Sequence, residues 1–120
     1  MSIKIGEVSI LTGDVVRMAD FYKALLGIEN NSNDPVHQFL ITEETMLTVY
    51  NDGIAHSGQN ICLAFTVEDI DLAREKVYSL GAITVQEVMT QPWGTRNMCF
   101  LDPDGNCVYL RQFPSNRIPE

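Results

Sequence analysis

An internal repeat constrains the fold of this chain more than any other sequence feature, because the same pattern occurs twice at a spacing of 55 residues. An apolar segment, residues 7–11 (EVSIL), is followed by Asp14, and a second, residues 62–66 (CLAFT), is followed by Asp69. Each Asp precedes a stretch with apolar residues three and four apart, which predicts an amphipathic helix with the Asp as its N-cap. Each stretch ends in Leu-Gly, which is typical of a helix C-terminus. A half of about 55 residues buries too little surface to be stable alone, so we expect the halves or two subunits to pack together.

Extended segments follow each predicted helix. In the second half, residues 83–89, 97–101 and 107–113 have the β-branched and aromatic content of strands. Residues 102–106 (DPDGN) predict a tight turn between the last two, because Pro presets one backbone dihedral and Gly supplies the positive one. The second half therefore reads as strand, helix and three strands.

The first half follows the same order less clearly. Residues 36–41 and 46–50 predict two strands around a turn at 42–45, and the stretch after Ile28, rich in Asn and Ser, predicts a poorer edge strand. The fold class predicted is α+β, as two βαβββ modules covering residues 1–52 and 60–113 with a linker at 53–59.

The acidic composition of the chain limits the kinds of partner that it can bind. The chain has 120 residues, with sixteen acidic against eight basic side chains and a formal net charge of −8. Such a chain repels nucleic-acid phosphates and anionic lipid headgroups, which excludes nucleic-acid and membrane-surface binding, and no apolar run is long enough to span a bilayer. Three cysteines, an odd number, with no apolar signal segment after Met1 favour a reducing cytoplasm.

The alternation of side chains along each strand separates a helix-covered face from an opposite, outward face. The outward face is expected to carry small, polar and aromatic side chains, a mixture that suits the lining of a ligand cleft. Its expected members are Glu7, Ser9, Thr48, Tyr50, Cys62, Ala64, Thr66, Cys107, Tyr109 and Arg111.

These features together resemble the vicinal oxygen chelate superfamily, which includes glyoxalase I, fosfomycin resistance proteins, ring-cleaving dioxygenases and bleomycin resistance proteins. The resemblance rests on the repeat, on Phe21-Tyr22 and Leu26-Gly27, and on the turn at 102–106, and it covers essentially the whole chain. The segment 91–94 (QPWG) followed by this turn is most similar to the bleomycin resistance branch. The resemblance implies curved mixed sheets around a cleft, and a homodimer in which the second subunit helps to complete that cleft.

The resemblance also identifies where a divalent metal would be held. Metal-dependent members use His, Gln or Glu side chains in the first and last strand of each half. The corresponding residues here are Glu7, Thr48, Cys62 and Tyr109. One carboxylate, one hydroxyl, one thiol and one phenol are not a donor set that holds a divalent cation, and a shift of one residue brings in apolar side chains instead.

Because the residues at the metal positions differ from those of metal-dependent members, the resemblance implies a metal-free, non-catalytic protein. Such a protein binds a small molecule, such as an antibiotic, and acts by sequestration. Two alternatives stay open: a diverged metal-dependent lyase, transferase or dioxygenase that retains Glu7 and requires a divalent metal, and a structural module whose cleft is filled. Under the binding hypothesis no cofactor and no catalytic residue is expected.

Several candidate residues have two interpretations. Glu7 either pairs with Arg96 or Arg111, or contacts a cationic ligand. Trp93 is either a lid over the sheet or a flat wall for a planar or cationic ligand.

The remaining candidates are assigned more simply. Tyr50 and Tyr109 are candidates for a second aromatic wall, and Arg96 and Arg111 for holding an anionic group. Cys62 is interpreted as a small buried packing residue and not as a nucleophile, and the two histidines, His37 and His56, as surface residues.

Overall fold

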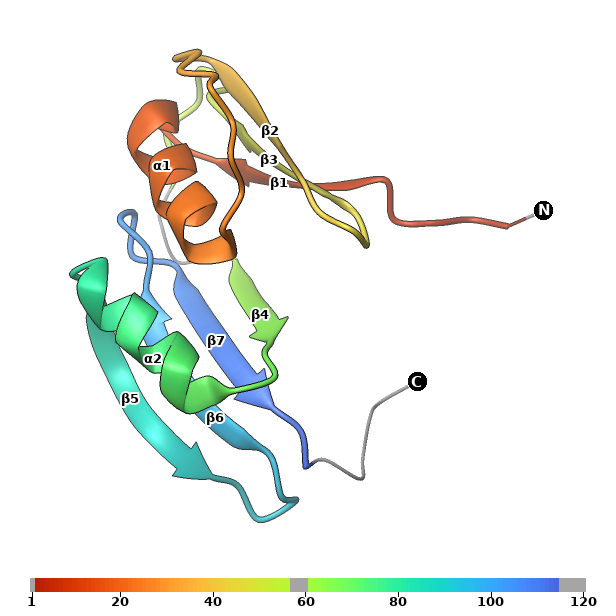
Figure 1. Cartoon of the computed structure of the whole chain (residues 1–120). Coiled ribbons are helices and arrows are strands. Elements are labelled where there is room, and N and C mark those ends of the chain that lie inside the picture. Colours follow the sequence, from red (N-terminus) through yellow and green to blue (C-terminus); the bar gives the residue numbers. More distant parts are fainter. Residues whose placement is uncertain (1, 57–60, 115–120) are drawn as a thin grey trace. The chain divides into compact units, whose positions relative to one another are not determined.

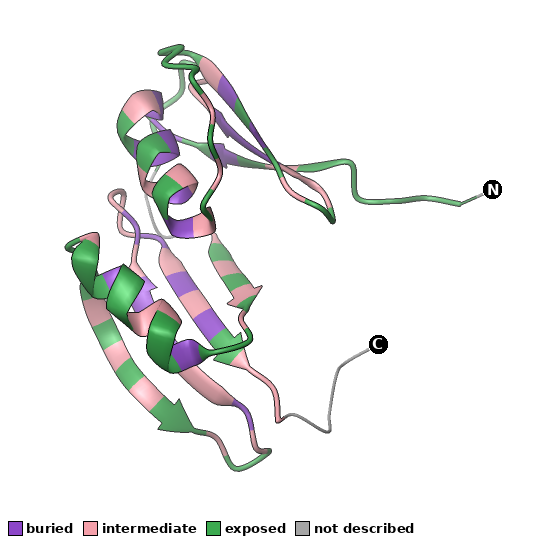
Figure 2. Ribbon diagram, in the orientation of Figure 1, coloured by how far each residue is buried: buried purple, intermediate pink, exposed green. Residues whose placement is uncertain are grey.

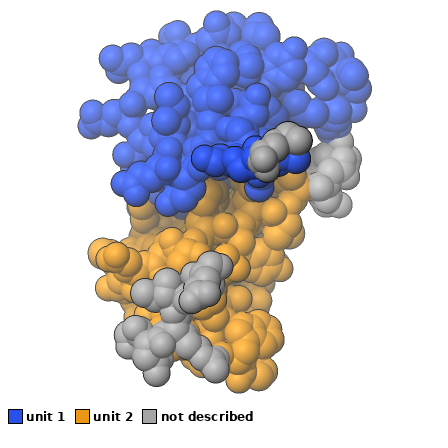
Figure 3. Space-filling model, turned by 90° about the vertical axis from the view of Figure 1, so that its right-hand side faces the viewer, with its two compact units in different colours: residues 1–58 blue, residues 59–120 orange. Residues whose placement is uncertain are grey.

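The computed structural model describes residues 2–56 and 61–114. The chain divides into two compact units, residues 1–58 and 59–120 (Figure 3). Each unit has its own sheet and one helix, as the sequence repeat predicts.

The first unit is a three-stranded sheet with one helix. Its elements are β1 (Glu7–Leu11), α1 (Val15–Leu26), β2 (His37–Ile41) and β3 (Met46–Tyr50) (Figure 1). The strand order is β1-β3-β2, with β1 parallel and β2 antiparallel to the central β3. The parallel β1–β3 pair requires a crossover connection, and the chain between them contains α1.

Helix α1 begins and ends where the sequence predicts. The Asp14 carboxylate accepts a hydrogen bond from the Arg17 backbone N–H, and Gly27 takes the left-handed conformation (φ 68°) that ends the helix. The helix buries one face, which carries Met18, Ala19 and Tyr22. These side chains form the core of the unit with apolar residues of the strands, as the purple stripes of Figure 2 show.

The edge strand expected after Ile28 is absent from the described residues, so that prediction was wrong. In this segment, side chains form hydrogen bonds with backbone groups in place of the backbone–backbone bonds of a strand. Asn30 donates its amide to the Phe39 carbonyl of β2, while its own oxygen accepts from the Ser32 N–H. Asp34 likewise accepts from the backbone N–H groups of Val36 and His37, and these bonds hold the pKa of Asp34 below its usual value. Asn, Ser and Asp favour such local bonds over a β ladder.

The second unit is a four-stranded sheet with one helix. Its elements are β4 (Cys62–Thr66), α2 (Ile70–Ser79), β5 (Ile83–Thr90), β6 (Arg96–Leu101) and β7 (Cys107–Gln112). The order is β4-β7-β6-β5, in which β4 and β7 are parallel and the other pairs antiparallel. All five elements were predicted from the sequence, with ends that differ by no more than one residue.

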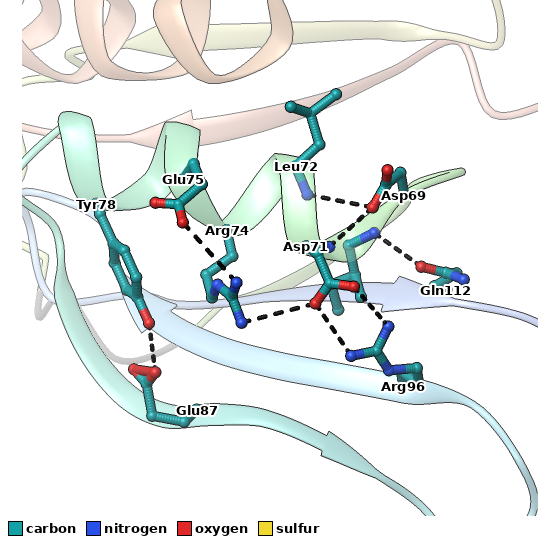
Figure 4. Close-up of polar contacts among 10 residues, drawn as sticks. Asp69, Asp71, Leu72, Arg74, Glu75, Tyr78, Glu87, Arg96 and Gln112 are labelled. Carbon is teal, nitrogen blue, oxygen red and sulfur yellow. Dashed lines mark hydrogen bonds and ion pairs between the residues drawn. The ribbon is translucent and has the colours of Figure 1, made fainter.

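Polar contacts fasten α2 to the sheet (Figure 4). The Asp69 carboxylate caps the helix by accepting from the N–H groups of Asp71 and Leu72. The Gln112 side chain accepts from the Ile70 N–H, also at the first turn. Near the other end, the Tyr78 hydroxyl donates to Glu87 of β5, which raises the pKa of Tyr78.

The turn at 102–106 closes the β6–β7 hairpin as predicted. Asp102 is buried, and its carboxylate accepts from the backbone N–H groups of Asp104 and Asn106 and from the Asn106 side chain. Gly105 has φ 87°, the positive value that the turn requires.

The two units together have the α+β class predicted from the sequence, as two βαβββ-like modules of which the first lacks one strand. In the predicted linker, residues 53–56 contain no helix or strand, and 57–59 lie outside the described residues. In the part of the chain that the structure describes, no helix has the length and apolar character needed to cross a membrane.

Candidate functional site

The candidate site residues lie on the side of each sheet opposite its helix, which we call the open face of that module. In the first module, the residues that point toward α1 include the buried Ile10, Leu40 and Val49. Strand alternation and register put the remaining residues on the first open face. They are Glu7, Ser9, Leu11, His37, Phe39, Ile41, Met46, Thr48 and Tyr50.

A hydroxyl pair occupies the centre of the first open face. Ser9 and Thr48 are partners in the β1–β3 register, and their side-chain hydroxyls are hydrogen-bonded to each other. Thr48 is fully buried, whereas Glu7, two residues before Ser9 on the same strand, is exposed. Thr48 and Glu7 therefore have the orientation predicted, and the Thr48 hydroxyl already has a partner.

An aromatic cluster lies at one edge of the first open face. His37 contacts Phe39 with 4.4 Å between ring centroids, and Tyr50 with 4.7 Å. The sequence predicts Tyr50 on this face, but it favours a surface position for His37, and Phe39 is not among the predicted site residues. The alternation along β2 carries the missing signal, since it puts His37 and Phe39 on one face, but only the β2–β3 register brings His37 opposite Tyr50.

The other histidine, His56, has a local role. Its Nε2 lies 2.9 Å and 3.0 Å from the two carboxylate oxygens of Asp52, four residues earlier. This hydrogen bond is the main cause that lowers the pKa of Asp52. Because His56 pairs locally, we do not include it in the candidate site.

The open face of the second module is ordered in rows across the sheet. One row contains Cys62, Cys107 and Leu101, the next Ala64, Tyr109 and Cys99, and the last Thr66, Arg111 and Asn97. All three cysteines of the chain thus share this face with Tyr109. Cys62 and Cys107 are predicted on this face from the sequence, whereas Cys99 and Asn97 are not among the predicted residues.

The three thiols differ in their exposure. Cys62 is exposed, so the expectation that it is a buried packing residue was wrong, whereas Cys107 is half-buried and Cys99 is buried. Burial is the main cause that raises the pKa of the Cys99 thiol, and neighbouring Cys107 and Cys62 add to the effect, while a hydrogen bond with Tyr109 opposes it. The main cause that raises the pKa of Tyr109 is electrostatic repulsion from the negative charge of an ionised Cys99 thiolate.

The opposite end of this face is polar. Arg111 donates from Nε to the Thr66 hydroxyl at 3.1 Å, and its guanidinium carbon lies 5.1 Å from the centre of the Phe113 ring. Asn97 is the register partner of Arg111, and its side-chain oxygen is buried with no hydrogen-bond partner among the described residues. A cation and an amide oxygen are therefore side by side at this end, which gives it the means to contact a polar ligand group.

Of two further predicted site residues, one points away from the open face and the other lies in a turn. Arg96 points to the helix-covered side, where both of its terminal nitrogens donate to Asp71 of α2 at 3.0 Å (Figure 4). Consecutive strand residues face opposite sides, so Asn97 takes the position on the open face. Trp93 lies in the turn between β5 and β6 and is 61% exposed, which does not match a lid packed over the sheet.

Comparisons with known proteins identify the family. The family model described as the Glyoxalase/Bleomycin resistance protein/Dioxygenase superfamily matches residues 4–110. This chain belongs to the glyoxalase/bleomycin resistance protein/dioxygenase superfamily. A search of curated proteins finds no match.

Solved structures of the superfamily share the fold. A glyoxalase/bleomycin resistance protein/dioxygenase family enzyme from Burkholderia phytofirmans has a TM-score of 0.79 at 19% identity, over 93% of this chain and 100% of that one. A lactoylglutathione lyase from Agrobacterium tumefaciens has a TM-score of 0.74 at 19% identity, over 93% of this chain and 95% of that one. At such identities the similarity shows the fold alone.

The side chains at the superfamily's metal positions show whether this member has suitable ligands for a divalent ion. In the first module they correspond to the exposed Glu7 and to Thr48, whose hydroxyl is bonded to Ser9. In the second they correspond to Cys62 and Tyr109, a thiol and a phenol on the face with the other two cysteines. Among the described residues, no group of three or more His, Cys, Asp or Glu side chains has an arrangement that could hold a metal ion. Because only Glu7 is a donor of the kind that these members use, the residues do not fit the divalent metal.

Proposed function

We propose that this superfamily member is a metal-free binding protein for a small organic molecule, similar to bleomycin resistance proteins, and that it acts by sequestration. The observation that carries the proposal is the donor set at the superfamily's metal positions, where Glu7 is accompanied by Thr48, Cys62 and Tyr109. A donor set that does not hold a metal ion supplies no Lewis acid to polarise a substrate. The side chains of the open faces can still bind a ligand.

The first open face supports a planar ligand. His37, Phe39 and Tyr50 present adjacent rings, and such rings bind flat or cationic groups by stacking and by cation–π attraction. Glu7 adds an exposed carboxylate on the same face. We infer that the ligand combines a flat ring system with a positive charge, as some antibiotics do.

The charge of the whole chain favours the same ligand. A net charge of −8 raises the local concentration of cations near the protein and speeds their association. This effect weakens with ionic strength, so salt should reduce the affinity for a cationic ligand.

The alternative is a diverged metal-dependent lyase, transferase or dioxygenase. One observation favours it, since Glu7 is a competent ligand at a metal position and is accessible. Such an enzyme would need further ligands from positions other than those that the superfamily uses.

The test is a calorimetric titration with bleomycin and with a panel of planar cationic compounds, with and without a chelator. We expect saturable binding that the chelator does not change. Glu7→Gln should weaken binding about threefold to tenfold, which corresponds to the loss of one favourable charge contact. Glu44→Gln is the matched control, because it removes the same charge from the exposed turn between β2 and β3.

Two results would contradict the proposal. One is stoichiometric metal in protein purified without chelator, together with a large drop of the melting temperature when the metal is removed, which would favour the metalloenzyme. The other is an absence of binding across the panel, which would favour a structural module.

A further inference from the structure

Two cysteines of the second open face are neighbours across a strand pair. Cys62 of β4 and Cys107 of β7 are partners in the parallel register, and both side chains point to the open face. Neighbouring strands lie about 4.8 Å apart. This spacing falls inside the range of about 4.4 to 6.8 Å between Cα atoms that a disulfide requires.

We propose that Cys62 and Cys107 are a redox-active dithiol pair that a hydroperoxide converts into an intramolecular disulfide. This site lies outside the proposed ligand contacts of the first open face, and the inference does not depend on the proposed function. Its ligand class is a small peroxide, either hydrogen peroxide or an organic hydroperoxide.

The difference in exposure assigns the order of the two steps. The exposed Cys62 thiolate attacks the outer oxygen of the peroxide, which breaks the O–O bond, forms a sulfenic acid and releases water or an alcohol. The half-buried Cys107 then attacks the Cys62 sulfur, which forms the S–S bond and releases the sulfenic oxygen as water. The pair gives up two electrons and two protons, and the peroxide accepts them.

The third cysteine is excluded by its surroundings. Cys99 is buried and is the register partner of Tyr109 on the antiparallel side of β7, not of another cysteine. Its raised pKa keeps it in the thiol form, which is the unreactive one. Cys99 is therefore a bystander that stays reduced.

The position of β4 permits the bridge to form. β4 is an edge strand, hydrogen-bonded only to β7 in the described sheet, so it can shift by the small amount that the two sulfurs need. The bridge would include the exposed Cys62, and exposed disulfides are among those that are easily reduced. We therefore expect reversible oxidation, which would remove two thiols from the open face beside Tyr109.

The experiment uses the full chain, reduced, freed of reductant and treated with hydrogen peroxide. After blocking with N-ethylmaleimide, intact mass should show that two of the three thiols are lost, and dithiothreitol should restore both. Digestion with trypsin and a protease that cleaves before Asp separates Cys99 from Cys107, because Asp102 and Asp104 lie between them. The bridged peptides should then contain Cys62 and Cys107.

Serine variants provide the controls. Cys62→Ser and Cys107→Ser should each lose the bridge completely, while Cys99→Ser should form it at a rate within about twofold of the parent protein. Circular dichroism verifies that each variant is folded. A bridge between Cys99 and Cys107, a disulfide between chains, or over-oxidation of Cys62 without a bridge would each overturn the proposal. So would three intact thiols after excess peroxide.

Discussion

At the scale of single residues, consecutive residues of β6 point to opposite sides of the sheet and make different contacts. Arg96 reaches across to Asp71 of α2 and fastens the helix, whereas Asn97, the next residue, lies on the open face beside Arg111. Strand alternation predicted the orientation of Thr48, Tyr50 and Tyr109 from the sequence. Arg96 lies just outside the strand predicted at residues 97–101, so alternation assigned it no face, and only the structure shows that it points to α2.

The Arg96–Asp71 pair makes a pH-dependent contribution to stability. Arg96 lowers the pKa of Asp71 below its ordinary value of 3.8, chiefly through the hydrogen bond. Since the folded-state pKa is depressed, the pair stabilises the protein above pH 3.8 and loses this contribution as the pH falls through the folded-state value. We expect Arg96→Met to lower the melting temperature at pH 7, with a difference from the parent protein that shrinks below pH 3.8.

A thermal melt at a series of pH values measures this difference. Lys76→Met is the matched control, because it removes an exposed positive charge from α2. An Arg96→Met difference that stays constant from pH 7 to below 3.8 would mean that packing, and not the charge pair, is responsible.

At the scale of elements, local signals define where the helices begin and end. Asp14 and Asp69 both cap a helix, and Gly27 ends one with a positive φ. These signals could be found in the sequence because each depends on a few adjacent residues. The missing strand of the first module shows where such signals fail, since the side chains of Asn30 and Asp34 compete for hydrogen bonds that the sequence pattern assigned to a strand.

The cap of α2 gives a prediction at this scale. The Asp69 carboxylate accepts from two backbone N–H groups, so Asp69→Ala should lower the free energy of unfolding by about 1 kcal/mol. Asp69→Asn keeps an acceptor oxygen at the same position and should recover most of that loss. Urea denaturation measures both variants, and an equal loss in the two would show that the charge of Asp69 matters more than its hydrogen bonds.

At the scale of the whole molecule, exposed apolar side chains point to self-association. Phe39 and Ile41 on the first open face are 47% and 73% exposed, and Ile83 and Val85 on the edge strand β5 are exposed as well. Exposed apolar surfaces of this kind usually bind another protein, and most soluble oligomers consist of copies of one chain. We propose a homodimer in which a second subunit packs against the exposed side chain of Ile41 and helps to complete the ligand cleft without covering the aromatic cluster.

Sedimentation analysis tests this proposal. The parent protein should have twice the mass of the 13.5 kDa chain, and Ile41→Asp should shift it toward the monomer. Leu72→Asp is the control, because Leu72 is similarly exposed, at 71%, but belongs to α2. A parent protein that is monomeric at high concentration, or a dimer unaffected by Ile41→Asp, would contradict it.

The sequence by itself determined the repeat, the helix caps, the turn at 102–106 and the alternation of faces, because each depends on interactions among residues close in the chain. Through the family resemblance, it also led us to expect Glu7, Thr48, Cys62 and Tyr109 at the superfamily's metal positions. Only the tertiary structure decided which side chains become neighbours: His37 beside Tyr50, Arg96 beside Asp71, and Cys62 beside Cys107. The strand orders β1-β3-β2 and β4-β7-β6-β5 bring these distant residues together, and register is set by packing between strands, not by local preference.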